Sequence, residues 1–187
     1  IMLHAPTGTG KTYAVWGGIL NESFELKKIE EGINVLWITP LKALAVEIQK
    51  STQQLCTDLK TDIKVDLRTG DTPQSRRIKQ NKNFPFGLIT TPESLHILLS
   101  SKKHKDFFKS LRTIVVDEWH ELLGTKRGVQ VELAVSYLRF LLPKLKIIGI
   151  SATLGNRELA GEILMGLGNN FKTCLLYTSD AADEVRR

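Results

Sequence analysis

A short segment near the start of the sequence combines glycine, lysine and threonine at a spacing suited to phosphate binding. Residues 5–12 read APTGTGKT, which matches G-x-x-x-x-G-K-[ST] except that Ala5 replaces the first glycine. An apolar run precedes the segment and a helical pattern follows it, so backbone N–H groups at a helix N-terminus are expected to face a triphosphate. This context disfavours the alternative of a plain glycine-rich turn. The candidate nucleotide-binding residues are Thr7, Gly8, Thr9, Gly10, Lys11 and Thr12.

Two adjacent carboxylates form a second candidate site. Residues 113–120 read TIVVDEWH, an apolar run that ends in Asp117 and Glu118. Asp117 is expected to hold Mg²⁺ together with the Thr12 hydroxyl, because this hard cation prefers oxygen ligands. Glu118 is expected to orient and deprotonate the water that attacks the γ-phosphate. Alone, such a pair is more often a solvated helix start. Beside the phosphate loop the catalytic interpretation is favoured, with Lys11, Asp117 and Glu118 as candidate catalytic residues.

The elements that position these residues are expected to alternate along the chain. Apolar, β-branched runs predict strands over residues 1–4, 35–39, 63–67, 87–90, 113–116 and 146–150. Longer amphipathic stretches predict helices over residues 11–20, 41–56, 73–80, 92–100, 129–142 and 158–165. Runs such as VLWI and TIVV are apolar on both faces, which is typical of parallel strands covered by helices on each side. The sequence therefore predicts a three-layer α/β domain with a mostly parallel sheet and both sites at its carboxyl edge.

The composition is that of a globular domain. The chain has 187 residues, 42% hydrophobic and 25% charged, with a net charge of +6. No apolar run approaches the roughly 18 residues that a membrane span needs. No export signal is recognisable, so we expect a cytoplasmic protein that does not enter a membrane. Cys56 and Cys174 are too few for a disulfide framework and lack metal-ligand spacing, so both are expected to be reduced thiols.

Both ends of the sequence are unusual for a complete protein. The chain enters the phosphate loop almost at once, which indicates an internal fragment. Residues 174–184, CLLYTSDAADE, resemble the translation of a sequencing-library transposase adapter, with a genuine terminal strand and helix as the alternative. We therefore expect the domain to span residues 1–173 and the tail, residues 174–187, to lie outside it. Without the tail, 24 basic and 17 acidic residues remain, so the net charge is +7.

Three motifs in this order resemble those of the superfamily 2 DExH-box helicases. Residues 5–12, residues 117–120 and Ser151-Ala152-Thr153 correspond to motifs I, II and III. The segments ITPLKALAVEI, RTGDT, ITTPESL and VVDEWHELLGTKRGVQVEL are similar to the Lhr branch, and DEWH with the following KRG most resembles the bacterial ligase-associated DEXH-box DNA helicases. The resemblance covers nearly all of residues 1–173. It implies the first of two RecA-like P-loop NTPase motor domains, with the second absent from this sequence.

The resemblance also implies roles for matching residues. The set implied to bind and hydrolyse Mg-ATP comprises Lys11, Thr12, Asp117 and Glu118. The set implied to couple nucleotide state to nucleic acid comprises His120, Ser151 and Thr153. From the residues alone, these hydroxyls fit an ordinary strand-end cap equally well, and a single histidine is usually only packed or hydrogen-bonded. The aromatic motif that reads adenine in many relatives would precede Ile1, so adenine selectivity is implied only by the family.

A nucleic-acid track is expected on the same edge of the sheet. Segments that follow three predicted strands each open a helix, and helix N-termini with basic side chains suit contacts to the backbone of a single strand. The candidate residues are Pro40, Lys42, Arg68, Gly70, Asp71, Thr91, Pro92, Glu93 and Arg127. A solvated helix face explains Arg76, Arg77, Lys79 and Lys82 at least as well, and Arg127-Gly128 could equally end a turn.

The expected function is that of an ATP-driven motor that moves on nucleic acid, and in the whole protein unwinds it. The expected cofactors are ATP and Mg²⁺. By the resemblance, DNA is favoured over RNA, and the partners are a second RecA-like domain and a DNA ligase or nuclease. Two alternatives stay open: a P-loop ATPase that acts on a protein partner, and a nucleotide-binding module without turnover.

Overall fold

The structure is a computed structural model that describes residues 1–4, 10–25, 30–152, 157–166 and 172–175. Seven strands form one sheet in the order β3-β4-β2-β5-β6-β1-β7. In chain order the strands are β1 (Met2–His4), β2 (Val35–Ile38), β3 (Val65–Arg68), β4 (Gly87–Thr90), β5 (Thr113–Val116), β6 (Lys146–Ser151) and β7 (Thr173–Leu175). Every described strand pair is parallel, which confirms the predicted parallel sheet.

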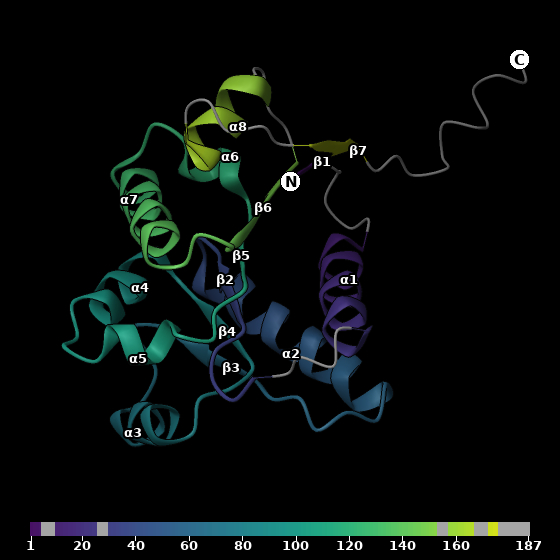
Figure 1. The fold of residues 1–187 in the computed structure, drawn as a ribbon, viewed down its shortest axis with the longest axis vertical. Helices are drawn as coiled ribbons and strands as arrows, with labels where there is room; N and C mark the ends of the chain where they lie inside the picture. The colour runs from purple at the N-terminus through teal and green to yellow at the C-terminus, as the bar shows by residue number, and fades with distance from the viewer. Residues whose placement is uncertain (5–9, 26–29, 153–156, 167–171, 176–187) are drawn as a thin grey trace, which may run out of the picture.

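Helices cover both faces of the sheet (Figure 1). One face carries α1 (Lys11–Glu25) and α2 (Lys42–Asp58). The other face carries α4 (Pro92–Leu99), α5 (His104–Phe108), α6 (Trp119–Leu122), α7 (Lys126–Leu141) and α8 (Arg157–Met165). The remaining helix, α3 (Gln74–Lys82), follows the edge strand β3. This arrangement confirms the three-layer α/β fold that the alternating pattern predicted.

Two apolar clusters, one on each face, explain why the central strands are apolar throughout. All four residues of β2, β4 and β5 are buried. Successive side chains of β2 alternate between the clusters: Leu36 and Ile38 pack with the α7 side, while Val35 and Trp37 pack with α1 and α2. A strand buried on both faces cannot show the polar alternation of a half-exposed strand.

The start of α7 differs from the prediction. The helix begins at Lys126, three residues before the predicted start, because Thr125 caps it: its Oγ1 accepts the Gly128 N–H at 3.0 Å. A Cβ on Gly128 would lie 2.1 Å from the Leu122 carbonyl oxygen at the end of α6. Gly128 is therefore a helical residue that allows the close approach of two helices. The short helices α5 and α6 were not predicted.

The chain beyond residue 172 contributes one strand to the described structure. Thr173–Leu175 forms β7, which pairs with β1 in parallel, with Met2 opposite Thr173. The side chains of Thr173 and Cys174 are exposed, and residues 176–187 lie outside the described residues. Both cysteines are free thiols. Within the described ranges, no helix has the length and apolarity to cross a lipid bilayer.

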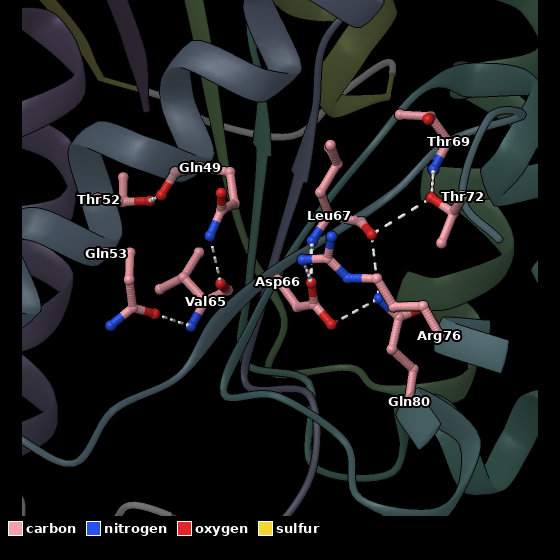
Figure 2. A network of polar contacts seen from close by, with 10 residues as sticks. All are labelled: Gln49, Thr52, Gln53, Val65, Asp66, Leu67, Thr69, Thr72, Arg76 and Gln80. Atoms are coloured by element: carbon pink, nitrogen blue, oxygen red, sulfur yellow. Dashed lines mark hydrogen bonds and ion pairs between the residues drawn. The ribbon is translucent and has the colours of Figure 1, made fainter. Parts of the chain in front are cut away.

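Side chains close the free edge of β3 (Figure 2). The backbone N–H and C=O of Val65 and Leu67 bond to side chains there. The Val65 N–H donates to Gln53 Oε1 and the Val65 carbonyl accepts from Gln49 Nε2, both at 2.9 Å. The Leu67 N–H donates to Asp66 Oδ1 at 2.8 Å, and the Leu67 carbonyl accepts from Gln80 Nε2 at 3.0 Å. The polar groups that an edge strand leaves unpaired are therefore satisfied within the chain.

Candidate nucleotide and nucleic-acid site

The nucleotide side of the site begins with α1. Gly10 has a φ of +75°, a left-handed conformation that favours glycine, and its carbonyl accepts the Ala14 N–H at 3.0 Å. Lys11 opens the helix and is buried, and Thr12 is half-buried. The start of α1 thus combines the N–H groups of a helix N-terminus, a cation and a hydroxyl, which are the groups that bind a polyphosphate. The other predicted loop residues, Thr7, Gly8 and Thr9, lie outside the described residues.

Asp117 follows β5 directly, and its carboxylate is held on both oxygens. Its N–H donates to the Ile38 carbonyl at 2.8 Å, which extends the pairing with β2 by one residue. Oδ1 accepts the Glu118 backbone N–H at 2.9 Å, and Oδ2 accepts the Trp37 indole N–H at 3.3 Å. Each carboxylate oxygen retains lone pairs, so Asp117 can still bind a water molecule or a cation.

The surroundings of Asp117 favour a cation. Burial, together with the neighbouring Glu118 carboxylate, raises the pKa of Asp117 to about 6, although the Glu118 N–H, the Trp37 indole and Lys11 act in the opposite direction. In the described ranges, no cluster of three or more His, Cys, Asp or Glu side chains could hold a metal unaided. One buried carboxylate near the start of α1 therefore fits Mg²⁺ bound together with phosphate oxygens and water.

Glu118 stands at a strained position between a lysine and a histidine. Its φ of 48° and ψ of 44° are left-handed, which costs a non-glycine residue about 1 kcal/mol or more. Its Oε1 lies 3.8 Å from Lys11 Nζ, and its Oε2 lies 3.4 Å from His120 Nδ1. The backbone turn between β5 and α6 therefore brings the predicted general base beside the predicted phosphate-binding lysine.

His120 links this carboxylate to the neighbouring strand. Its Nδ1 lies 3.2 Å from the Oγ of Ser151, the last residue of β6, which is fully buried. Its Nε2 lies 3.6 Å from Glu121 Oε1. The imidazole thus contacts Glu118 and Ser151 with the same nitrogen, Nδ1. Thr153, the third residue predicted to couple the sites, lies outside the described residues.

Arg127 joins two segments of the predicted nucleic-acid track. Its Nε lies 2.6 Å from Glu93 Oε1, and one terminal nitrogen donates to the Pro40 carbonyl at 2.5 Å. Partial burial acts to raise the pKa of Glu93, but the hydrogen bonds from Arg127 oppose it, and the net result is a lowered pKa. Thr91 and Pro92 are buried at the start of α4. The guanidinium thereby fixes the ends of β2 and β4 relative to α7, and residue 127 lies within the helix instead of ending a turn.

The third segment of the track is joined to the first by an exposed ion pair. Lys42 Nζ lies 2.8 Å from Asp71 Oδ1, and both side chains are largely exposed. Gly70 lies beneath this pair, since a Cβ added there would be 3.7 Å from the Lys42 ammonium. Arg68 donates to Asn81 Oδ1 at 2.8 Å. The predicted track residues at or just after the ends of β2, β3 and β4 therefore lie together at the carboxyl edge of the sheet.

The arginines of α3 are bonded within the protein and are not a fully solvated face. The Arg77 guanidinium donates to three carbonyls of the preceding loop, at Thr69, Gly70 and Thr72. Arg76 forms an ion pair with Asp66. Lys79 and Lys82 are exposed. Arg77 therefore holds the 69–72 loop in its conformation through hydrogen bonds to the loop's carbonyls. The basic sequence pattern alone did not reveal this structural role.

Trp37 is a site residue that its sequence pattern does not reveal. The pattern predicts only a buried strand, yet the indole N–H bonds to the Asp117 carboxylate. A signal was present, because a buried tryptophan normally needs an acceptor for its N–H, and VLWI offers no acceptor of its own. The identity of that acceptor depends on a contact between residues 80 positions apart, which no local pattern encodes.

Proteins of known name are similar to this chain in sequence. Over 183 residues the chain is 33% identical to the ATP-dependent helicase Lhr-Core of Saccharolobus solfataricus, covering 92% of this chain and 21% of that protein. The chain therefore spans about a fifth of the length of this relative. This similarity confirms the predicted resemblance to the Lhr branch.

Solved structures share the fold. Helicase Lhr of Mycobacterium smegmatis, bound to ssDNA and AMP-PNP, matches with a TM-score of 0.76 and 33% identity over 94% of this chain and 23% of that chain. Mss116p bound to ssRNA and AMP-PNP matches with a TM-score of 0.78 and 25% identity over 93% of this chain and 35% of that chain. The family model of the DEAD/DEAH box helicases matches residues 1–160. The chain, with its all-parallel RecA-like sheet, belongs to the DEAD/DEAH box helicase family.

Proposed function

We propose that this chain is the ATP-binding half of a motor that couples Mg-ATP hydrolysis to movement along a single nucleic-acid strand. One observation carries the proposal: at the carboxyl edge of the sheet, Lys11, Asp117 and Glu118 lie beside the His120–Ser151 contact. Phosphate binding, metal binding, proton abstraction and a link to the neighbouring strand are thereby available in one place. Ligands of open α/β sheets bind at this edge.

Each side chain has a distinct task in the proposed reaction. Lys11 and the N-terminus of α1 bind the β- and γ-phosphates, and the Thr12 hydroxyl and Asp117 hold Mg²⁺. When bound by these residues, Mg²⁺ would supply positive charge that offsets the charge of the phosphates. The Glu118 carboxylate orients the attacking water and accepts its proton. His120 Nδ1 contacts both Glu118 and Ser151, so a movement of Glu118 during hydrolysis is transmitted to Ser151.

We further propose that the strand is DNA and that it lies along the segments held by Arg127 and Lys42. The ends of these segments combine helix N-termini with exposed basic groups. Such groups can bind the phosphate backbone of a strand without contacting its bases. The Lhr structure bound to ssDNA favours DNA, whereas the match to Mss116p, which binds ssRNA, keeps RNA as the alternative outcome. A ligase or nuclease partner is supported only by the resemblance of the DEWH and KRG segments.

The decisive measurement is ATP turnover with and without single-stranded nucleic acid. The chain alone should bind Mg-ATP but hydrolyse it very slowly, because arginines of a second RecA-like domain are expected to supply about 10³–10⁵ of the rate. Joined to that domain, it should be stimulated by ssDNA more than by ssRNA. Stimulation by neither, in an active two-domain protein, would favour an ATPase that acts on a protein partner. Fast stimulated turnover by the chain alone would contradict the two-domain mechanism.

A further inference from the structure

Trp37 makes the one hydrogen bond to Asp117 Oδ2 that is seen among the described residues. The side chain is fully buried on β2, and its Nε1–H lies 3.3 Å from that oxygen. The opposite oxygen, Oδ1, is held by the Glu118 backbone N–H at 2.9 Å. Without the indole, the buried Oδ2 would lose its hydrogen-bond donor. A buried carboxylate oxygen that has no donor lowers the stability of the folded state. The bond therefore both compensates the burial of Asp117 and fixes its rotation.

The indole is itself held in place. Trp37 stacks on Trp16 with ring centroids 5.9 Å apart and planes inclined by 2°. Behind this pair, Gly87 leaves no spare room, since a Cβ added there would lie 2.4 Å from the Trp16 ring. Trp16 belongs to α1, the helix that Lys11 opens. A stacked pair thus connects the phosphate-binding helix to the carboxylate at the end of β5.

We propose that Trp37 is a positioning residue. It orients Asp117 for Mg²⁺ and fixes the position of this carboxylate relative to α1. This inference rests on the proposed function, because it assigns Asp117 to metal binding. Residues that hydrogen-bond a metal ligand orient it, and their loss typically weakens the site. Trp37 acts only through Asp117.

Trp16 provides a matched control. It is buried as completely as Trp37, belongs to the same stack, and has an Nε1–H with no acceptor within the described parts of the chain. Replacing either tryptophan by phenylalanine removes the same volume and keeps an aromatic ring. Only Trp37→Phe also removes a donor from Asp117. The two variants therefore separate the hydrogen bond from the packing.

The first test compares ATP binding with Mg²⁺ and with EDTA, measured by titration of a fluorescent ATP analogue into the chain. Trp37→Phe should weaken binding in Mg²⁺ about tenfold, as loss of a ligand's supporting bond does, and leave binding in EDTA unchanged. Trp16→Phe should change neither affinity by more than about twofold, because it removes no hydrogen bond. Equal losses in Mg²⁺ and EDTA, or equal losses in both variants, would assign Trp37 to packing alone.

The second test does not depend on nucleotide binding. The three indole N–H signals of the chain can be assigned in nitrogen-15 NMR spectra from the Trp→Phe variants. Asp117→Asn should move the Trp37 indole signal most, because the charged acceptor becomes a neutral amide. An unmoved Trp37 signal overturns the inference. If the signal moves but the chain binds no ATP in either buffer, the proposed function fails while the Trp37–Asp117 bond stands, and the metal-positioning role falls with that function.

Discussion

The charged side chains of the nucleotide site are arranged around one carboxylate whose backbone is strained. Glu118 adopts a left-handed conformation, and the cost of that conformation is offset by the bond from its N–H to Asp117. The side chain consequently lies near Lys11 and His120, and is not directed along the strand. The proposed general base thus occupies a backbone conformation that favours glycine.

This arrangement predicts different defects for two substitutions. In a protein that contains both motor domains, Glu118→Gln should retain ATP binding and lose hydrolysis, because an amide keeps the shape but does not accept the proton of the attacking water. Lys11→Ala should instead weaken ATP binding itself. Equilibrium binding and steady-state turnover, measured on both variants, distinguish the two effects. An unchanged turnover rate in Glu118→Gln would refute its assignment as the general base.

At the scale of secondary structure, the join between α6 and α7 leaves no room for a side chain. A Cβ on Gly128 would meet the Leu122 carbonyl oxygen at 2.1 Å, and backbone atoms cannot give way as a flexible side chain can. Gly128→Ala should therefore lower the free energy of unfolding by about 1–3 kcal/mol. Chemical denaturation followed by circular dichroism measures this change.

Gly18 is the control for that prediction. It lies exposed inside α1, and a Cβ added there would have no atom of the described residues within 4 Å. Gly18→Ala should raise the free energy of unfolding by about 0.5–1 kcal/mol, because alanine loses less backbone entropy in a helix. If Gly128→Ala were also stabilising, the close approach of α6 and α7 would be wrong.

The closed edge of β3 gives a second prediction for an element. Gln53→Leu removes the acceptor of the Val65 N–H, whereas Gln54→Leu on the same helix removes only an exposed bond to Asp58. The first variant should speed hydrogen exchange at the Val65 amide about tenfold and increase self-association, since an open edge can pair with a second chain. The second should do neither. Unchanged exchange and scattering in Gln53→Leu would show that the side chain does not protect the edge.

The fold and the centre of the site could be predicted because their signals are local. Doubly apolar runs indicate buried parallel strands, and the Lys11 and Asp117 motifs each follow such a run. Three features could not be predicted: the Trp37 bond to Asp117, the place of Gly128 against Leu122, and the Gln53 bond to Val65. Each depends on which elements become neighbours, and that is decided by packing and not by periodicity.

At the scale of the whole molecule, the site stands at one edge of a sheet that lies in the middle of three layers. Strand ends from the centre of the sheet supply the nucleotide side, while the ends of β2, β3 and β4 supply the track. Both candidate sites therefore involve β2: Trp37 on this strand bonds to Asp117, and Pro40, two residues after its end, bonds to Arg127. We propose that this shared central strand is a route by which nucleotide binding and nucleic-acid binding influence each other.

The last strand of the sheet is where the proposed domain limit can be tested. We propose that residues 174–187 are dispensable, although Cys174 and Leu175 continue β7 beside β1. The other side of β1 pairs with β6, and the Lys172 carbonyl that accepts the Met2 N–H at 2.8 Å remains after truncation. Removal of the exposed Cys174 should leave no cavity, so truncation after Thr173 should lower the free energy of unfolding by about 1 kcal/mol or less.

Thermal and urea unfolding of the full and truncated chains measure that difference. A matched comparison is Ile150→Ala, which removes a fully buried side chain from β6 and should cost about 2–5 kcal/mol. If truncation cost as much as this core substitution, the terminal strand would be an integral part of the sheet. The similarity of residues 174–184 to adapter sequence would then be coincidental, and the domain limit would have to move beyond Thr173, since only native packing against β1 explains so large a loss.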